Sequence, residues 1–139
     1  MHLTRLVYAS TIASDFRPEN IEDILRVSRA NNAKNGVTGV LFFNSNYFLQ
    51  CLEGDRQAVC GTYHRIAFDT RHEHPIILSY NEVAKRDFAD WAMGYVPTNR
   101  ITDAVNSHLI GEADFQPYSM SMAAAVQMVD ALRDCLHTQ

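Results

Sequence analysis

The stretch "NYFLQCLEGDR", residues 46–56, has the pattern of a strand with a glutamine among apolar residues. Side chains alternate along a strand, and apolar residues occupy both faces of this one, which predicts a strand that is buried on both sides. Gln50 lies on the same face as Phe48 and Leu52. Because a buried primary amide without hydrogen-bond partners costs about 1–3 kcal/mol, the fold has to supply polar partners for Gln50.

Further elements follow in both directions from this strand. The turn residues "NSN" at 44–46 connect it to the apolar stretch "VTGVLFF", which predicts a β-hairpin. Pro18 suits the first turn of a helix. The inward stripe of that helix consists of Ile21, Ile24, Leu25 and Ser28. The expected elements, in chain order, are a strand at 3–10, a helix at 18–32, strands at 37–43 and 47–53, a helix at 56–69, and strands at 75–83 and 91–96.

The order of these elements is β-α-β-β-α-β with one more strand, which is the split βαβ, or ferredoxin-like, arrangement. We therefore expect an α+β fold in which a mixed sheet carries both helices on one face. On the fifth strand, the alternation of side chains predicts that Trp91, Met93 and Tyr95 share a face.

The tail, residues 98–139, is expected to be a C-terminal helical extension of a first domain at 1–97. Ser119 or Ser121 is the expected cap of a last helix. The apolar stripe of this helix consists of Met122, Val126, Val129 and Leu136. Such a stripe needs a covering surface, and two remain open, namely the other face of the sheet and a partner protein.

Composition limits the class of protein. The chain has 139 residues, of which 47% are hydrophobic and 20% charged, as in one soluble globular domain. The net charge of -4 and the lack of a basic stripe predict no nucleic-acid binding. No apolar run reaches a membrane span, and the first residues do not resemble a signal peptide. Three cysteines without C-x-x-C spacing favour a reducing cytoplasm.

The first helix changes character at its end, where Ser28, Asn31 and Asn32 continue its inward stripe. One interpretation is a helix C-terminus with asparagine caps. The other is a ligand between the two helices, because an amide presents a donor beside an acceptor and so matches a heterocycle with an N–H next to a C=O.

Other polar positions likewise allow two interpretations. Tyr8 is either a core aromatic or part of a site, and Arg65 is either solvated or an anion clamp. Asp69, His72 and His74 are close in sequence, but they are an incomplete set of zinc ligands, so no metal is expected. The sequence contains no G-x-S-x-G, no glycine-rich phosphate loop and no paired carboxylates, which predicts that the protein is not an enzyme.

Five segments together resemble a known family. They are "RLVYAS", "ANNAKNGVTGVLFF", "YFLQCLEGDRQAV", "YHRIAFDTRHEHP" and "AKRDFADWAMGYV". In this order and at these separations they resemble the BLUF family, the blue-light sensors that use FAD, over residues 3–97. The tail resembles the helical extension of the short, single-domain members.

The resemblance implies a site for the flavin ring between the two helices. It implies that Asn32 holds the N3–H and C4=O edge of the ring and that Gln50 bonds to both the flavin and Tyr8. The other residues that the resemblance assigns are Asn31 and Ser28 beside Asn32, Ile24 and Ile66 on the two sides of the ring, Arg65, Asp69, Arg71 and His72 toward the ribityl and phosphate end, and Trp91 and Met93 near Gln50 on the last strand.

The function that the resemblance implies is light-driven electron transfer from Tyr8 to the flavin, followed by the proton, which leaves Gln50 rotated or tautomerised. FAD is the expected cofactor, although contacts to the ring alone do not separate it from FMN or riboflavin. With no output domain in the chain, the signal is expected to leave through a homo-oligomer or a downstream signalling protein in the cytoplasm. Two alternatives remain, a flavin-dependent redox enzyme and an acylphosphatase-like hydrolase.

Overall fold

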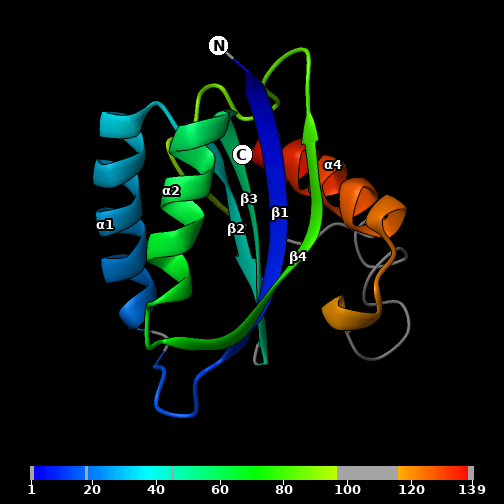
Figure 1. The fold of residues 1–139 in the computed structure, drawn as a ribbon. Coiled ribbons are helices and arrows are strands. Elements are labelled where there is room, and N and C mark those ends of the chain that lie inside the picture. The colour runs from blue at the N-terminus through cyan, green and yellow to red at the C-terminus, as the bar shows by residue number, and fades with distance from the viewer. Residues whose placement is uncertain (1, 18, 45, 97–115, 138–139) are drawn as a thin grey trace.

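A computed structural model of the chain describes residues 2–17, 19–44, 46–96 and 116–137 (Figure 1). The elements are β1 (Leu3–Ile12), α1 (Asn20–Asn35), β2 (Thr38–Phe43), β3 (Tyr47–Asp55), α2 (Arg56–Ala67), β4 (His72–Glu82), β5 (Gly94–Val96), the short 3-10 helix η3 (Pro117–Ser119) and α4 (Met122–His137). The predicted domain boundary after residue 97 and the connector that follows it lie outside the described residues.

The five strands form one mixed sheet in the order β4-β1-β3-β2-β5. Neighbouring strands are antiparallel except β2 and β5, which run parallel. The predicted hairpin is present, since β2 pairs with β3 from Phe43 and Phe48 to Thr38 and Glu53. This is the expected ferredoxin-like order with a fifth strand added at one edge.

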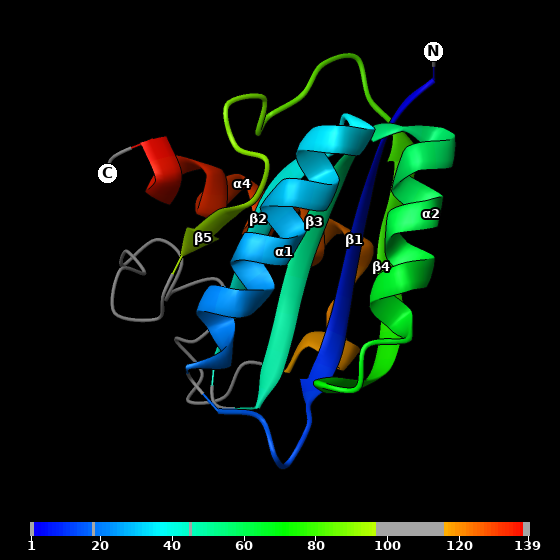
Figure 2. The ribbon, with the colours of Figure 1, turned by 90° about the vertical axis from the view of Figure 1, so that its left-hand side faces the viewer.

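Helices cover both faces of the sheet. α1 and α2 lie side by side on one face, and α4 lies against the other (Figures 1 and 2). α2 begins where the Asp55 carboxylate accepts the Gln57 N–H at 3.3 Å. α4 begins where the Ser121 hydroxyl accepts the Ala124 N–H at 3.0 Å, so Ser121 and not Ser119 is the cap.

α4 contacts β2, β4 and β5, so the other face of the sheet covers its apolar stripe. The predicted stripe was partly wrong, because Met122 is 60% exposed and Val126 is only half-buried. The inward residues are Ala125, Met128, Val129, Leu132, Cys135 and Leu136. The difference has a physical reason: the buried residues recur at helical spacing from Ala125 to Leu136, and this spacing leaves Met122 before the stripe and Val126 at its edge.

The fifth strand is shorter than predicted, and this changes the direction of two side chains. Its ladder with β2 begins only at the pair Val40 and Gly94. Residues 91–93 are bent, so strand alternation does not apply to them. As a result Met93 packs in the core beneath α1 and α2, whereas Trp91 packs in the core beneath α4. The predicted common face of Trp91 and Met93 is wrong.

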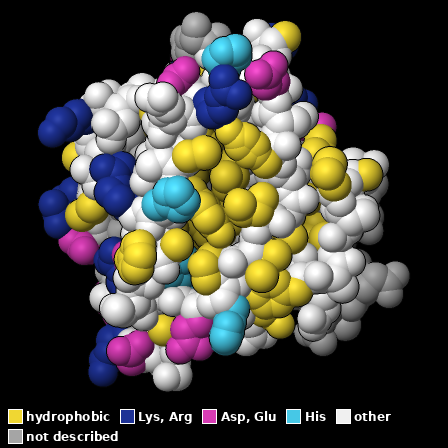
Figure 3. All heavy atoms as spheres, viewed as in Figure 1, with side chains coloured by type: hydrophobic (Ala, Val, Ile, Leu, Met, Phe, Trp, Pro, Cys, Tyr) yellow, Lys and Arg dark blue, Asp and Glu magenta, His cyan; other side chains and the backbone are white. Residues whose placement is uncertain are grey.

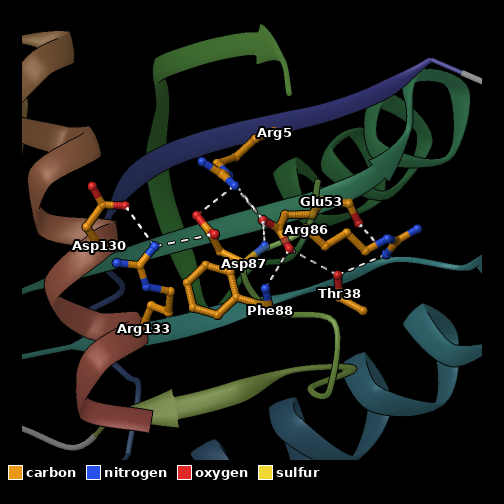
Figure 4. Close-up of polar contacts among 8 residues, drawn as sticks. All are labelled: Arg5, Thr38, Glu53, Arg86, Asp87, Phe88, Asp130 and Arg133. Carbon is orange, nitrogen blue, oxygen red and sulfur yellow. Dashed lines mark hydrogen bonds and ion pairs between the residues drawn. The ribbon is translucent and has the colours of Figure 1, made fainter. Parts of the chain in front are cut away.

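A buried carboxylate holds the segment between β4 and β5 (Figure 4). Glu53 on β3 is fully buried, and its oxygens accept from Arg5 at 2.9 Å and from the backbone N–H groups of Asp87 and Phe88 at 2.9 and 3.0 Å. The same Asp87 contacts Arg133 of α4 at 3.3 Å. The segment that leads into β5 is therefore joined both to the sheet and to the last helix.

Candidate functional site

A pocket opens between α1, α2 and the sheet face beneath them. It brings together all the predicted site residues except Trp91 and Met93. These are Tyr8, Ile24, Ser28, Asn31, Asn32, Gln50, Arg65, Ile66, Asp69, Arg71 and His72. Residues as far apart in the chain as Tyr8 and His72 thus meet at one site.

Gln50 lies on the floor of this pocket, where its buried amide has the hydrogen-bond partners that the sequence requires. Tyr8 on β1 is its partner in the β1–β3 register, so the two side chains point to the same face. The Tyr8 hydroxyl donates to Gln50 Oε1, and Gln50 Nε2 donates to Met93 Sδ at 3.4 Å. The three side chains are only 3%, 4% and 1% exposed. One amide end therefore has a strong partner and the other only a weak thioether acceptor.

The electrostatic environment keeps Tyr8 in its neutral, donating form. Burial raises the pKa of the Tyr8 hydroxyl well above its usual range, and the nearby Tyr63 and Asp69 raise it further. The Tyr63 ring meets the Tyr8 ring edge-on with the centroids 5.4 Å apart. A buried, protonated phenol bonded to an amide oxygen can release its proton only toward that oxygen.

The end of α1 supplies the amide groups on one wall. The helix continues to Asn35 and ends at Gly36, whose φ of 70° is the left-handed conformation typical of glycine caps. The N–H groups of Gly36 and Val37 both bond to the backbone oxygen of Asn32. The interpretation of Asn31 and Asn32 as side-chain caps is therefore wrong, because a backbone carbonyl and a glycine terminate the helix.

Asn32 is buried, and its side chain joins α1 to the segment before β5. Its Nδ2 donates to the Ala92 carbonyl oxygen at 2.8 Å. A primary amide carries two N–H donors and one oxygen acceptor, so as far as the described residues go, one N–H and the oxygen are left for a ligand in the pocket. Asn31 is half-buried beside it.

The opposite end of the pocket is charged. Arg71 forms an ion pair with Asp69, with Nη2 and Oδ2 2.6 Å apart, and a longer one with Asp23 at 3.3 Å. The hydrogen bond from Arg71 lowers the pKa of the Asp69 carboxyl. Arg65 lies at the rim, where its Nη2 is 3.4 Å from Thr62 Oγ1.

His72 is fixed by both of its ring nitrogens. Nε2 bonds to the Ile66 carbonyl at 2.6 Å and must carry the proton there, while Nδ1 lies 2.7 Å from the Ser10 hydroxyl. With Asp69 paired to Arg71, the segment does not assemble into a zinc ligand set. Across the described ranges, no group of three metal-ligating side chains occurs.

Four further residues line the pocket that the sequence reasoning missed. They are Val27, Leu41, Phe48 and Thr62. Two of them had a signal in the sequence: Phe48 shares the face of Gln50 two residues away, and Thr62 is one helical turn before Ile66. Leu41 is found only through the hairpin register, in which it pairs with Gln50.

Comparison with known proteins agrees with this geometry. Residues 3–94 match the family described as "BLUF: Sensors of blue-light using FAD". Over 91 residues, 66% of the chain, it is 34% identical to the blue light- and temperature-regulated antirepressor BluF of Escherichia coli, covering 23% of that protein. It is 32% identical over 94 residues to the photoactivated adenylate cyclase subunit beta of Euglena gracilis, covering 11% of it.

Solved structures extend the similarity over the tail. The ground state of BlsA superposes with a TM-score of 0.82 at 30% identity, covering 94% of this chain and 87% of that one. The dark-state structure of BlrB, a BLUF protein, gives 0.78 at 26% identity over 94% and 96%. The chain spans about a quarter or less of the two curated relatives but nearly all of these two structures. The chain therefore belongs to the BLUF family, the sensors of blue light that use FAD.

Proposed function

We propose that this chain is a blue-light photoreceptor that binds a flavin noncovalently in the pocket between α1 and α2. The observation that carries the proposal is the buried hydrogen-bonded group of Tyr8, Gln50 and Met93, of which Tyr8 and Gln50 line that pocket. When bound, the flavin supplies absorption of blue light and an excited ring that accepts an electron.

The residues present fit a flavin ring. Among the described residues, Gln50 Nε2 donates only to a thioether, and Asn32 keeps an amide oxygen and an N–H for a ligand. Apolar side chains on both helices, Ile24 and Ile66, line the two walls and suit the faces of a flat ring. Arg65 and Arg71 supply positive charge at the other end of the pocket, as a ribityl phosphate requires.

In this proposal Tyr8 is the electron donor. Loss of an electron makes the phenol strongly acidic, and its proton moves along the existing hydrogen bond to Gln50 Oε1. When the electron and proton return, Gln50 remains rotated or tautomerised. The exchange needs little space, because the oxygen and nitrogen ends of the amide are similar in size while one accepts and the other donates.

Two finer points belong to the same proposal. FAD is the proposed flavin, since the family is described by it, although a related structure, BlrP1 of Klebsiella pneumoniae, is described with FMN. The charged end of the pocket suits either phosphate. Heating the purified protein and identifying the released flavin by mass spectrometry decides between them.

The signal is proposed to reach a second copy or a downstream protein in the cytoplasm. Figure 3 shows hydrophobic side chains gathered at the centre of one face, over the edge strand β4. The large exposed hydrophobic residues of β4 are Ile76, Ile77 and Tyr80. None of the helices in the described part of the chain could span a membrane. Size-exclusion chromatography in darkness and under blue light tests whether the chain associates with a second copy of itself, and an unchanged elution volume favours a downstream protein.

The decisive experiment is a light-minus-dark difference spectrum. The purified protein should be yellow, and blue light should shift its absorption to the red reversibly. Gln50→Leu should keep the flavin and lose the shift, because leucine has nothing to reverse. A colourless protein that takes up no added flavin contradicts the proposal, and so does a normal shift in Gln50→Leu.

A further inference from the structure

The segment just before β5, residues 91–93, is held through three consecutive carbonyl groups. The carbonyl oxygens of residues 91, 92 and 93 accept, in order, from the Gly39 N–H at 3.1 Å, from Asn32 Nδ2 at 2.8 Å and from Arg29 Nε at 3.0 Å. The ladder to β2 begins only at Gly94, so these bonds act where no strand pairing holds the chain. Two of the three donors are side chains of α1.

Those two α1 residues differ in what else they do. Asn32 lines the pocket and is buried, whereas Arg29, one turn earlier, is exposed and is not part of the pocket lining. Within the described residues, the bond to the Met93 carbonyl is the only polar contact of the Arg29 guanidinium. Arg29 thus reaches across from α1 to hold Met93 without touching the space for the flavin.

The held residue is the one whose side chain touches Gln50. Met93 Sδ accepts from Gln50 Nε2, while the backbone oxygen of the same residue accepts from Arg29. A thioether is a weak acceptor on a flexible chain of three rotatable bonds, so its position depends on a fixed backbone. Loosening the backbone of Met93 withdraws the acceptor that favours the present orientation of the Gln50 amide.

We propose that Arg29 is a positioning residue that holds Met93 against Gln50 and thereby sets the lifetime of the light-induced state. This inference rests on the proposed photochemistry. The present amide orientation is the one in which Nε2 faces sulfur, and the reversed amide makes no such bond. In darkness the Gln50 amide returns to its present orientation faster when the Met93 sulfur atom is in place to accept its N–H. Loss of the Arg29 bond leaves Met93 less fixed and should therefore slow dark recovery.

The test is the rate of dark recovery, followed by absorbance after a blue-light pulse. Arg29→Met should bind flavin with unchanged affinity and should recover at least about threefold more slowly, because a charge-assisted hydrogen bond is lost. Arg29→Lys, which keeps a donor and the charge, should recover at an intermediate rate. The matched control is Lys34→Met, which removes an exposed cation from the same helix and should recover at the wild-type rate.

A double variant separates positioning from a general structural effect. If Arg29 acts through the sulfur atom, Arg29→Met should change the recovery rate little in a Met93→Leu background, since no acceptor remains to be positioned. An equal slowing in both backgrounds contradicts the inference, as does wild-type recovery in Arg29→Met or loss of its flavin. A wild-type protein that shows no light-induced shift contradicts the proposed function instead.

Discussion

Glu53 offers the sharpest test of how the segment between β4 and β5 is held. Each of its carboxylate oxygens accepts a backbone N–H, Oε2 from Asp87 at 2.9 Å and Oε1 from Phe88 at 3.0 Å. In Glu53→Gln one oxygen becomes an NH2 group, so whichever way the amide turns, one of these backbone donors faces another donor. A buried group left in this way costs about 1–3 kcal/mol.

The substitution also removes negative charge beside Arg5, which keeps Asp87 at 2.8 Å as its remaining partner. A hydrogen bond to a charged group contributes about 1.5–3 kcal/mol, and part of it is retained. Together the two effects predict that the free energy of unfolding falls by about 3–5 kcal/mol, the range observed when one partner of a buried ion pair is removed.

Urea unfolding measures this loss, with flavin in a fixed excess because a bound ligand raises apparent stability. Glu82→Gln is the matched control: it removes the same charge from an exposed side chain that His2 contacts at 3.3 Å, and it should cost less than about 1 kcal/mol. If Glu53→Gln lost no more than its control, the buried carboxylate would not be what anchors the segment.

Three further predictions concern the pocket and the last helix. Tyr8→Phe should keep flavin bound, lose the red shift and lengthen the flavin fluorescence lifetime in time-resolved decay; an undiminished shift would require another donor. Asn32→Ala should weaken flavin binding by about fivefold to 150-fold in a fluorescence titration, and more than Asn31→Ala; equal affinities would contradict the buried position of Asn32. Leu132→Ala should lower unfolding stability by about 2–5 kcal/mol and the exposed Met122→Ala hardly at all; similar values would mean that α4 does not cover the sheet in solution.

The sequence predicted what depends on local pattern. The hairpin, both early helices and the ferredoxin-like order follow from apolar periodicity and turn residues, which act over a few positions. The buried amide of Gln50 was likewise visible from alternation within one strand. That its partner is Tyr8 was expected only through the family resemblance, because 42 residues separate the two and no local rule sets the register of β1 against β3.

What the sequence did not indicate depends on long-range contacts. Glu53 lies within an apolar strand and carries a charge, yet it is fully buried because its donors come from residues 34, 35 and 48 positions away. Trp91 was expected beside Gln50 through the family resemblance. It was expected on the same face as Met93 because alternation was applied to residues that precede the strand. No local pattern marks Arg29, since only the folded chain brings the Met93 carbonyl to its guanidinium.

The unequal partners of Gln50 explain how its amide can serve as a switch. Reversing the amide brings Nε2 to the Tyr8 oxygen, which can accept as well as donate, so a hydrogen bond on that side is kept in the other sense. On the Met93 side only a weak bond to sulfur at 3.4 Å is lost. The two orientations therefore fill the same volume. Within the described residues the reversed one lacks the bond to sulfur and an acceptor for the Tyr8 O–H, a cost of about 1–3 kcal/mol. A strong acceptor in place of the sulfur atom would widen that gap and hold the amide in one orientation, whereas a thioether keeps both orientations within thermal reach.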